Sequence, residues 1–97
     1  MGNIDLPSLR YNAEAINKDV PIREVIERYT GIDTSVRGNI PCPSQSHGEK
    51  TPPAHIYDTH GKNNCFCFSC LQNFNPIDIV MQHTQASFPE ACKILID

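Results

Sequence analysis

Four cysteine and histidine side chains fall into two short pairs, and their spacing constrains the fold more than any other feature. Cys67 and Cys70 have two residues between them, Cys42 and His47 have four, and 19 residues separate His47 from Cys67. Two ligand pairs joined by a spacer of this length indicate a structural zinc site. Three thiolates and one imidazole complete a tetrahedral shell and leave no open position for a substrate. The spacing therefore predicts one structural Zn²⁺ ion in a binding module and argues against a metal-dependent hydrolase.

Two further residues compete for these ligand positions. Cys65 shares a strand face with Cys67, because side chains alternate along a strand with a period of two. It is an alternative ligand, although a thiol packed in the core is the favoured interpretation. His60 is the alternative to His47, and His55 and His83 are expected to be ordinary surface or strand histidines. Cys92 has apolar neighbours in a predicted helix, which favours packing.

The size and composition of the chain fit a single metal-stabilised domain. It has 97 residues, of which 39% are hydrophobic, and it lacks tryptophan. A core of this size gains stability from an added cross-link, which a zinc ion supplies. An odd count of five cysteines argues against a disulfide framework. No signal peptide and no membrane-spanning run is present, so we expect a cytoplasmic protein whose clustered cysteines bind metal.

The charge balance limits what the domain binds. The formal net charge is −3 and the isoelectric point is near 5.7. A domain devoted to tight, unspecific nucleic-acid binding is usually basic. Any nucleic-acid contact is therefore expected to be local and weak.

The apolar pattern predicts helices on either side of a zinc-bearing sheet. A short helix is expected over 11–19. A second helix begins at Pro21 and ends at Gly31, and its apolar face carries Ile22, Val25, Ile26 and Tyr29. An extended segment at 36–40 precedes a proline-rich loop at 41–53. Strands at 54–57 and 64–68 form a hairpin that runs into the cysteine turn. Asn75-Pro76 opens a third helix, whose inward residues are Ile77, Val80, Met81 and Thr84. The capping box from Ser87 to Glu90 opens a last helix, whose inward residues are Ala91, Ile94 and Leu95. The predicted fold class is α+β, a small zinc ribbon-like antiparallel sheet with flanking helices.

Five motifs occur in the order found in a known family. They are Cys42-Pro43, His47-Gly48-Glu49-Lys50-Thr51-Pro52, Cys67-Phe68-Ser69-Cys70, Ile77-Asp78-Ile79-Val80-Met81 and Ser87-Phe88-Pro89-Glu90-Ala91. Together with Val25-Ile26-Glu27-Arg28-Tyr29 they resemble the zinc-binding domain of bacterial and phage DNA primases. The resemblance covers residues 19–97, which we expect to form the domain, preceded by a flexible or weakly helical segment over 1–18.

The chain departs from the family pattern at three places. The first ligand pair is usually separated by two residues and here by four. We interpret the difference as a longer loop, because His47 is still separated from the Glu-Lys-Thr-Pro run by Gly48 alone. Ser69 replaces the usual glycine of the cysteine turn, at a mild cost if that position needs a positive φ. Pro53 replaces the usual serine.

The resemblance implies that the sheet contacts single-stranded template DNA. Single-strand binding uses cations along a groove and aromatic faces on which bases stack. The candidate cations are Arg37, Lys50 and Lys62, and the candidate aromatics are Tyr57, Phe66 and Phe68. The alternative for the aromatics is that they form the core under the helices.

No catalytic site is predicted within these residues. Nucleotidyl transfer needs clustered carboxylates that hold Mg²⁺, and Asp58, Asp78 and Asp97 show no such grouping. The expected function is therefore that of a primase zinc-binding domain, which binds template DNA and helps a separate catalytic domain to begin an RNA primer. Its expected partners are single-stranded DNA, that catalytic domain and a replicative helicase. The alternative is a zinc-stabilised protein-docking module of a mobile element or replication complex, without direct DNA binding.

Overall fold

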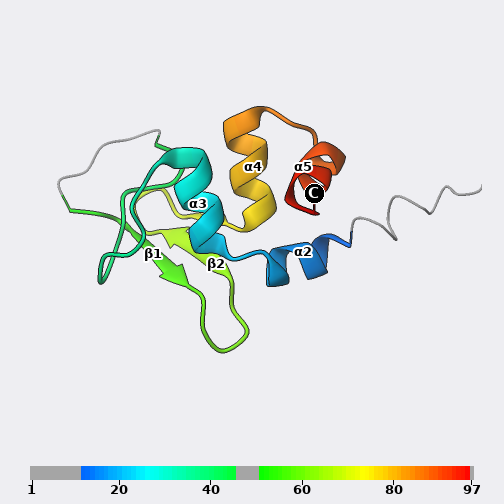
Figure 1. Cartoon of the computed structure of the whole chain (residues 1–97). Helices are drawn as coiled ribbons and strands as arrows, with labels where there is room; N and C mark the ends of the chain where they lie inside the picture. Colours follow the sequence, from blue (N-terminus) through cyan, green and yellow to red (C-terminus); the bar gives the residue numbers. More distant parts are fainter. Residues whose placement is uncertain (1–11, 46–50, 97) are drawn as a thin grey trace, which may run out of the picture.

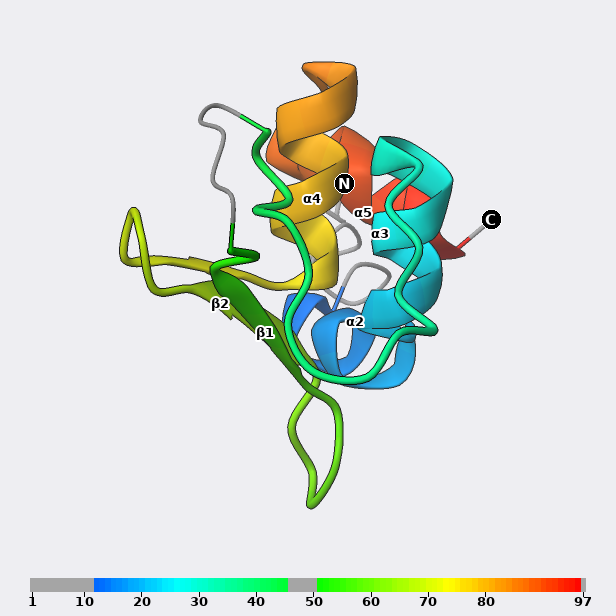
Figure 2. The same ribbon diagram turned by 90° about the vertical axis from the view of Figure 1, so that its left-hand side faces the viewer.

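The computed structural model describes residues 12–45 and 51–96. Its elements, in chain order, are the helices α2 (Ala13–Asp19) and α3 (Ile22–Thr30), the strands β1 (Ala54–Tyr57), β2 (Asn64–Cys67) and β3 (Gln72–Phe74), and the helices α4 (Pro76–Thr84) and α5 (Phe88–Ile96). The helices gather on one side of the three-stranded antiparallel sheet (Figures 1 and 2). This arrangement confirms the predicted α+β class. No helix in the described ranges is long and apolar enough to cross a membrane.

The sheet has the strand order β1-β2-β3, and its register separates a core face from an outer face. Ala54 pairs with Cys67 and Ile56 with Cys65, and all four side chains are buried. His55 pairs with Phe66 on the opposite face. β3 was not predicted, because two of its three residues are exposed and polar and give no apolar signal. The segment at 36–40, predicted to be extended, contributes only a bridge between Ile40 and Ala54.

Helix α3 contributes its apolar face to the core. Ile22, Val25 and Ile26 are buried along its predicted apolar face. The helix ends at Gly31, which has a φ of 80° and donates its N–H to the carbonyl of Glu27. Glycine adopts this left-handed conformation without steric cost, as expected for a C-cap.

The predicted caps of the last two helices are present. Asn75 and Asp78 form a reciprocal capping box at the start of α4, and the Glu90 carboxylate accepts from the Ser87 N–H at 3.0 Å at the start of α5. The inward residues are only partly as predicted. Ala91 is buried as predicted, together with Cys92, but Ile94 is 40% exposed. Thr84 is exposed as well.

Two asparagines join the helices to the hairpin. The Asn63 amide donates to the carbonyls of Asn17 at 2.7 Å and Val20 at 2.6 Å, and its oxygen accepts from the Ile22 N–H at 2.9 Å. The Asn17 oxygen accepts in turn from the Ile77 N–H, at the start of α4, at 3.0 Å. The turn after β1 is thereby fixed to α2, α3 and α4 at one point.

Candidate metal centre

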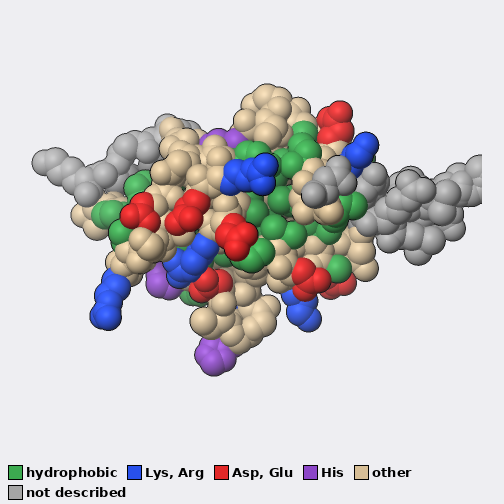
Figure 3. All heavy atoms as spheres, in the orientation of Figure 1, with side chains coloured by type: hydrophobic (Ala, Val, Ile, Leu, Met, Phe, Trp, Pro, Cys, Tyr) green, Lys and Arg blue, Asp and Glu red, His purple; other side chains and the backbone are tan. Residues whose placement is uncertain are grey.

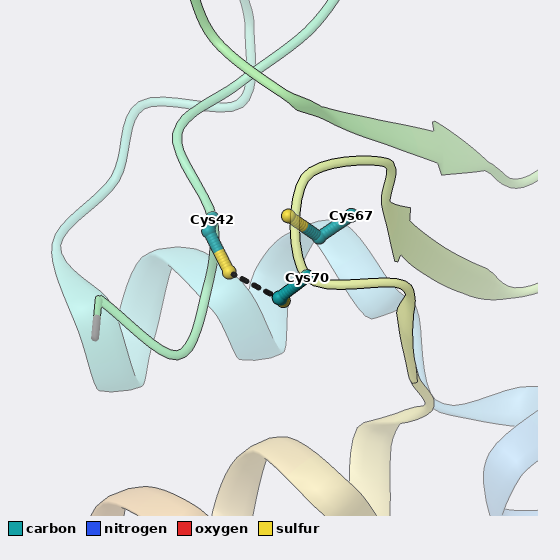
Figure 4. Close-up of side chains that lie close together, drawn as sticks. All are labelled: Cys42, Cys67 and Cys70. Atoms are coloured by element: carbon teal, nitrogen blue, oxygen red, sulfur yellow. Dashed lines mark hydrogen bonds between the residues drawn. The ribbon is translucent and has the colours of Figure 1, made fainter. Parts of the chain in front are cut away.

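Three cysteines from two distant segments meet beside the sheet. Cys42 follows the Ile40 bridge, Cys67 ends β2, and Cys70 lies in the turn before β3 (Figure 4). Their sulfur atoms all lie within 4.8 Å of one another, and the Sγ atoms of Cys42 and Cys70 are 3.8 Å apart. Tetrahedral zinc with bonds of about 2.3 Å places two ligand sulfurs about 3.8 Å apart. The spacing of the thiols therefore fits a zinc ion.

Backbone groups of the cysteine turn (residues 67–70) favour a thiolate at Cys67. Burial alone would raise the pKa of Cys67, but hydrogen bonds from the backbone of Cys70 and Ser69, and from the thiols of Cys70 and Cys42, lower that pKa to about 7. Burial and hydrogen bonds to the other two thiols raise the pKa of Cys70 to about 11. The thiolate form is therefore more accessible at Cys67 than at Cys70, and metal binding would displace the protons of the ligand thiols.

The residue with positive φ at the cysteine turn is not the one that the family pattern suggested. Ser69 is not among the residues with positive φ, so replacing glycine there costs no backbone strain. The left-handed residue is Leu71, with a φ of 59°. Its N–H donates to the Cys67 carbonyl at 2.8 Å and closes the turn.

The loop that carries Cys42 is held by both neighbouring helices. His83 of α4 lies 2.7 Å from the Pro43 carbonyl through its Nε2 atom, and the Gln45 amide donates to the Thr30 carbonyl at the end of α3 at 3.4 Å. The Ser44 hydroxyl lies 3.1 Å from the Cys42 sulfur. His83 was expected to be an ordinary surface histidine. No local pattern marks its role, because its partner lies 40 residues away in the sequence.

The competing ligands lie elsewhere. Cys65 is fully buried in the core, where burial and the charges of Cys42 and Cys67 raise its pKa to about 12. His60 lies in the exposed turn of the β1–β2 hairpin. Over residues 12–45 and 51–96, the cluster consists of Cys42, Cys67 and Cys70. His47 lies outside the described residues, so its place as the fourth ligand stays a prediction.

Aromatic side chains line the outer face of the sheet. The rings of Phe66 and Phe68 meet edge to face at 4.9 Å, and those of His55 and Tyr57 at 4.7 Å. The Lys62 ammonium lies 5.6 Å from the centre of the Tyr57 ring. Phe68 is 55% exposed, and the core is built from the opposite face. These rings therefore do not form the core under the helices.

The remaining predicted DNA-binding residues are Arg37 and Lys50. Arg37 is exposed on the loop that runs along the edge of β1. Lys50 lies outside the described residues. His55 belongs to the aromatic face although it was expected to be an ordinary histidine. Tyr57 lies two residues after His55 on β1, so the alternation of side chains along a strand could have predicted that both lie on the same face.

Comparison with known proteins identifies the family. DNA primases from Neisseria meningitidis serogroup A / serotype 4A (strain DSM 15465 / Z2491) and serogroup B (strain ATCC BAA-335 / MC58) are each 43% identical over 56 residues. The match covers 58% of this chain but only 9% of the length of each primase. No solved structure matches the chain at a comparable level. The family described as CHC2 zinc finger matches residues 9–97. The chain therefore belongs to the CHC2 zinc finger family, as a primase-type zinc-binding domain whose cysteine cluster accommodates one structural zinc ion.

Proposed function

We propose that this domain binds single-stranded template DNA on the outer face of its sheet and helps a separate catalytic domain to begin an RNA primer. The observation that carries the proposal is the row of partly exposed rings, Tyr57, Phe66 and Phe68, with Lys62 beside it. Bases stack on aromatic rings irrespective of sequence, at about 1–3 kcal/mol per base. The cysteine turn carries Phe68, so the metal centre supports the binding face.

The zinc shell is completed in this proposal by His47. Three sulfurs occupy three corners of a tetrahedron, and a structural zinc site has a fourth protein ligand. In the sequence, His47 is separated from Glu49-Lys50-Thr51-Pro52 by Gly48 alone and lies five positions after Cys42. When bound, the ion supplies stability to the fold and no reaction chemistry, because a shell of four protein ligands leaves no position for substrate.

The contact with DNA is expected to be weak. The net charge is −3, and Lys62 lies against the Tyr57 ring of the aromatic face. Arg37 and Lys50 are the further cations that we assign to the template strand. A domain with few cations binds a phosphate backbone with a shallow salt dependence.

Primer synthesis itself is assigned to another part of a longer protein. The two relatives are named DNA primases, and the match covers 9% of their length. The domain proposed here spans residues 19–97, after a segment at 1–18. Its partners would be the primase catalytic domain and a replicative helicase, in the cytoplasm.

Fluorescence anisotropy with labelled single-stranded oligonucleotides at low salt tests the DNA role. Phe68→Ala should weaken binding by about tenfold, the loss of one stacked base. Phe88→Ala is the matched control, because Phe88 is 47% exposed but lies on α5, away from the sheet. Lys62→Ala should weaken binding by a smaller factor. Absence of binding, or equal affinities for all three variants, would instead favour a docking module without direct DNA contact.

A further inference from the structure

The outer edge of β1 has an open position at Ile56. In an antiparallel sheet, the backbone groups of successive residues point alternately to the two neighbouring strands. Ala54 points away from β2, since its N–H and C=O bond to Ile40 at 3.0 and 2.8 Å. Ile56, two residues on, points the same way. In the described ranges no group bonds to its N–H or C=O on that side, although the residue is only 6% exposed.

The segment that could cover this edge is held elsewhere. Continuing the Ile40–Ala54 register would place Gly38 opposite Ile56, but Gly38 has a φ of 83° and the chain bends away there. Thr34 anchors the loop to α3, because the Glu27 carboxylate accepts from its N–H at 2.9 Å and from its hydroxyl at 2.7 Å. Thr34 is 2% exposed, so this anchor is part of the core. The gap is therefore built into the fold.

A groove of about 1000 Å³ occupies the gap between α3, the loop at 34–38 and β1. Acidic and basic side chains gather over this part of the surface (Figure 3). The ion pair of Arg23 and Asp58, at 2.5 Å, lies along it. An extended residue occupies about 160 Å³, from the rise per residue and the strand and sheet spacings, so the groove has room for a short extended segment.

We propose that this groove binds a short extended peptide, which adds to the sheet beside β1. Its backbone would pair with the N–H and C=O of Ile56, as in other cases of strand addition. Val36 is 47% exposed in the groove and offers an apolar contact. Arg37 is exposed there and, among the described residues, has no carboxylate within ion-pair distance. The peptide that we propose therefore carries one apolar and one acidic side chain, and it competes with the template strand for Arg37. A DNA backbone could pair with Arg37 but has no donor for the Ile56 carbonyl.

Selection of a random 12-residue peptide library against the zinc-loaded chain tests this proposal. Selected peptides are synthesised and titrated into isotope-labelled protein while backbone amide resonances are followed. The expected peptides contain an acidic residue next to an apolar one. They should shift the Ile56 amide and slow its hydrogen exchange at least tenfold. Val36→Glu, at an exposed loop position, should weaken their binding at least tenfold, and Lys62→Ala should leave it unchanged.

Three results would overturn the proposal. One is a library that yields no peptide binder. Another is a set of binders whose shifts lie at Phe66 and Phe68 or whose affinity is unaffected by Val36→Glu. The third is an Ile56 amide that, in the free protein, exchanges as slowly as that of Ala54, since the chain itself would then cover the edge. Oligonucleotide binding by the same samples is measured separately, so loss of the DNA role leaves this result unaffected.

Discussion

Replacing Asn63 by alanine should remove the point at which the hairpin is fixed to the helices. The side chain makes three hydrogen bonds, to the carbonyls of Asn17 and Val20 and from the N–H of Ile22. Ile22 is fully buried, so its N–H would lose its partner with little access to water. The variant therefore leaves a buried donor unsatisfied and frees two acceptors.

The expected loss of stability follows from these groups. An unsatisfied buried donor costs about 1–3 kcal/mol, and each of the other two hydrogen bonds contributes about 0.5–1.5 kcal/mol. Because Asn63 is half-buried, water replaces part of the latter, and we expect about 3 kcal/mol in total for Asn63→Ala. Small domains have unfolding free energies of about 5–15 kcal/mol, so the loss is a large share.

Urea unfolding at a fixed free zinc concentration measures this loss as a shift of the midpoint at constant slope. Asn64→Ala is the matched control, because the neighbouring side chain is bonded to Asn73 on the exposed face of the sheet. Its cost should stay below about 1 kcal/mol. Equal stabilities of the two alanine variants would refute the assigned role of Asn63.

Three further predictions address the metal centre and the loops. Cys67→Ser should lower the zinc content and remove the cooperative thermal transition, as a strong chelator should, whereas Cys92→Ser should keep one zinc per chain in elemental analysis. Hydrogen bonds from the hydroxyl and N–H of Thr34 lower the pKa of the Glu27 carboxyl. The contribution of Glu27 to the free energy of unfolding is therefore present above pH 4.5 and lost as the pH falls through the folded-state pKa. In urea titrations from pH 3 to 7, the stability of Glu27→Gln should fall less steeply with acid than that of the unmodified protein. His83→Ala should speed zinc transfer to a colorimetric chelator about fivefold, from one lost hydrogen bond of about 1 kcal/mol; an unchanged rate would contradict its role in positioning the loop.

The parts of the fold that depend on local chemistry could be predicted from the sequence. Gly31, Asn75 and Ser87 mark helix ends because their caps involve residues at most four positions away. The hairpin and the grouping of Cys42 with Cys67 and Cys70 follow from spacing as well. The cluster confirms the prediction of a zinc-binding fold.

Features that depend on distant partners could not be predicted in this way. β3 has too few residues for a period to appear, and its pairing depends on the turn that the cysteines form. The contacts of His83 with Pro43 and of Asn63 with Asn17 join segments 40 and 46 residues apart. The orientation of α5 depends on how Ala91 packs, and the apolar pattern alone allowed Ile94 to point inward.

The alternation of Cys65 and Cys67 bears on the fidelity of strand alignment. A slip of β2 by two residues keeps the same side chains facing the core, so the apolar pattern alone does not exclude it. Such a slip would bring Cys65 to the position of Cys67, opposite Ala54. Only the native alignment also puts the backbone of Ser69 and Cys70 against the ligand sulfur. Zinc binding therefore favours the native pairing over this slip, and the ion helps to fix the register of the sheet.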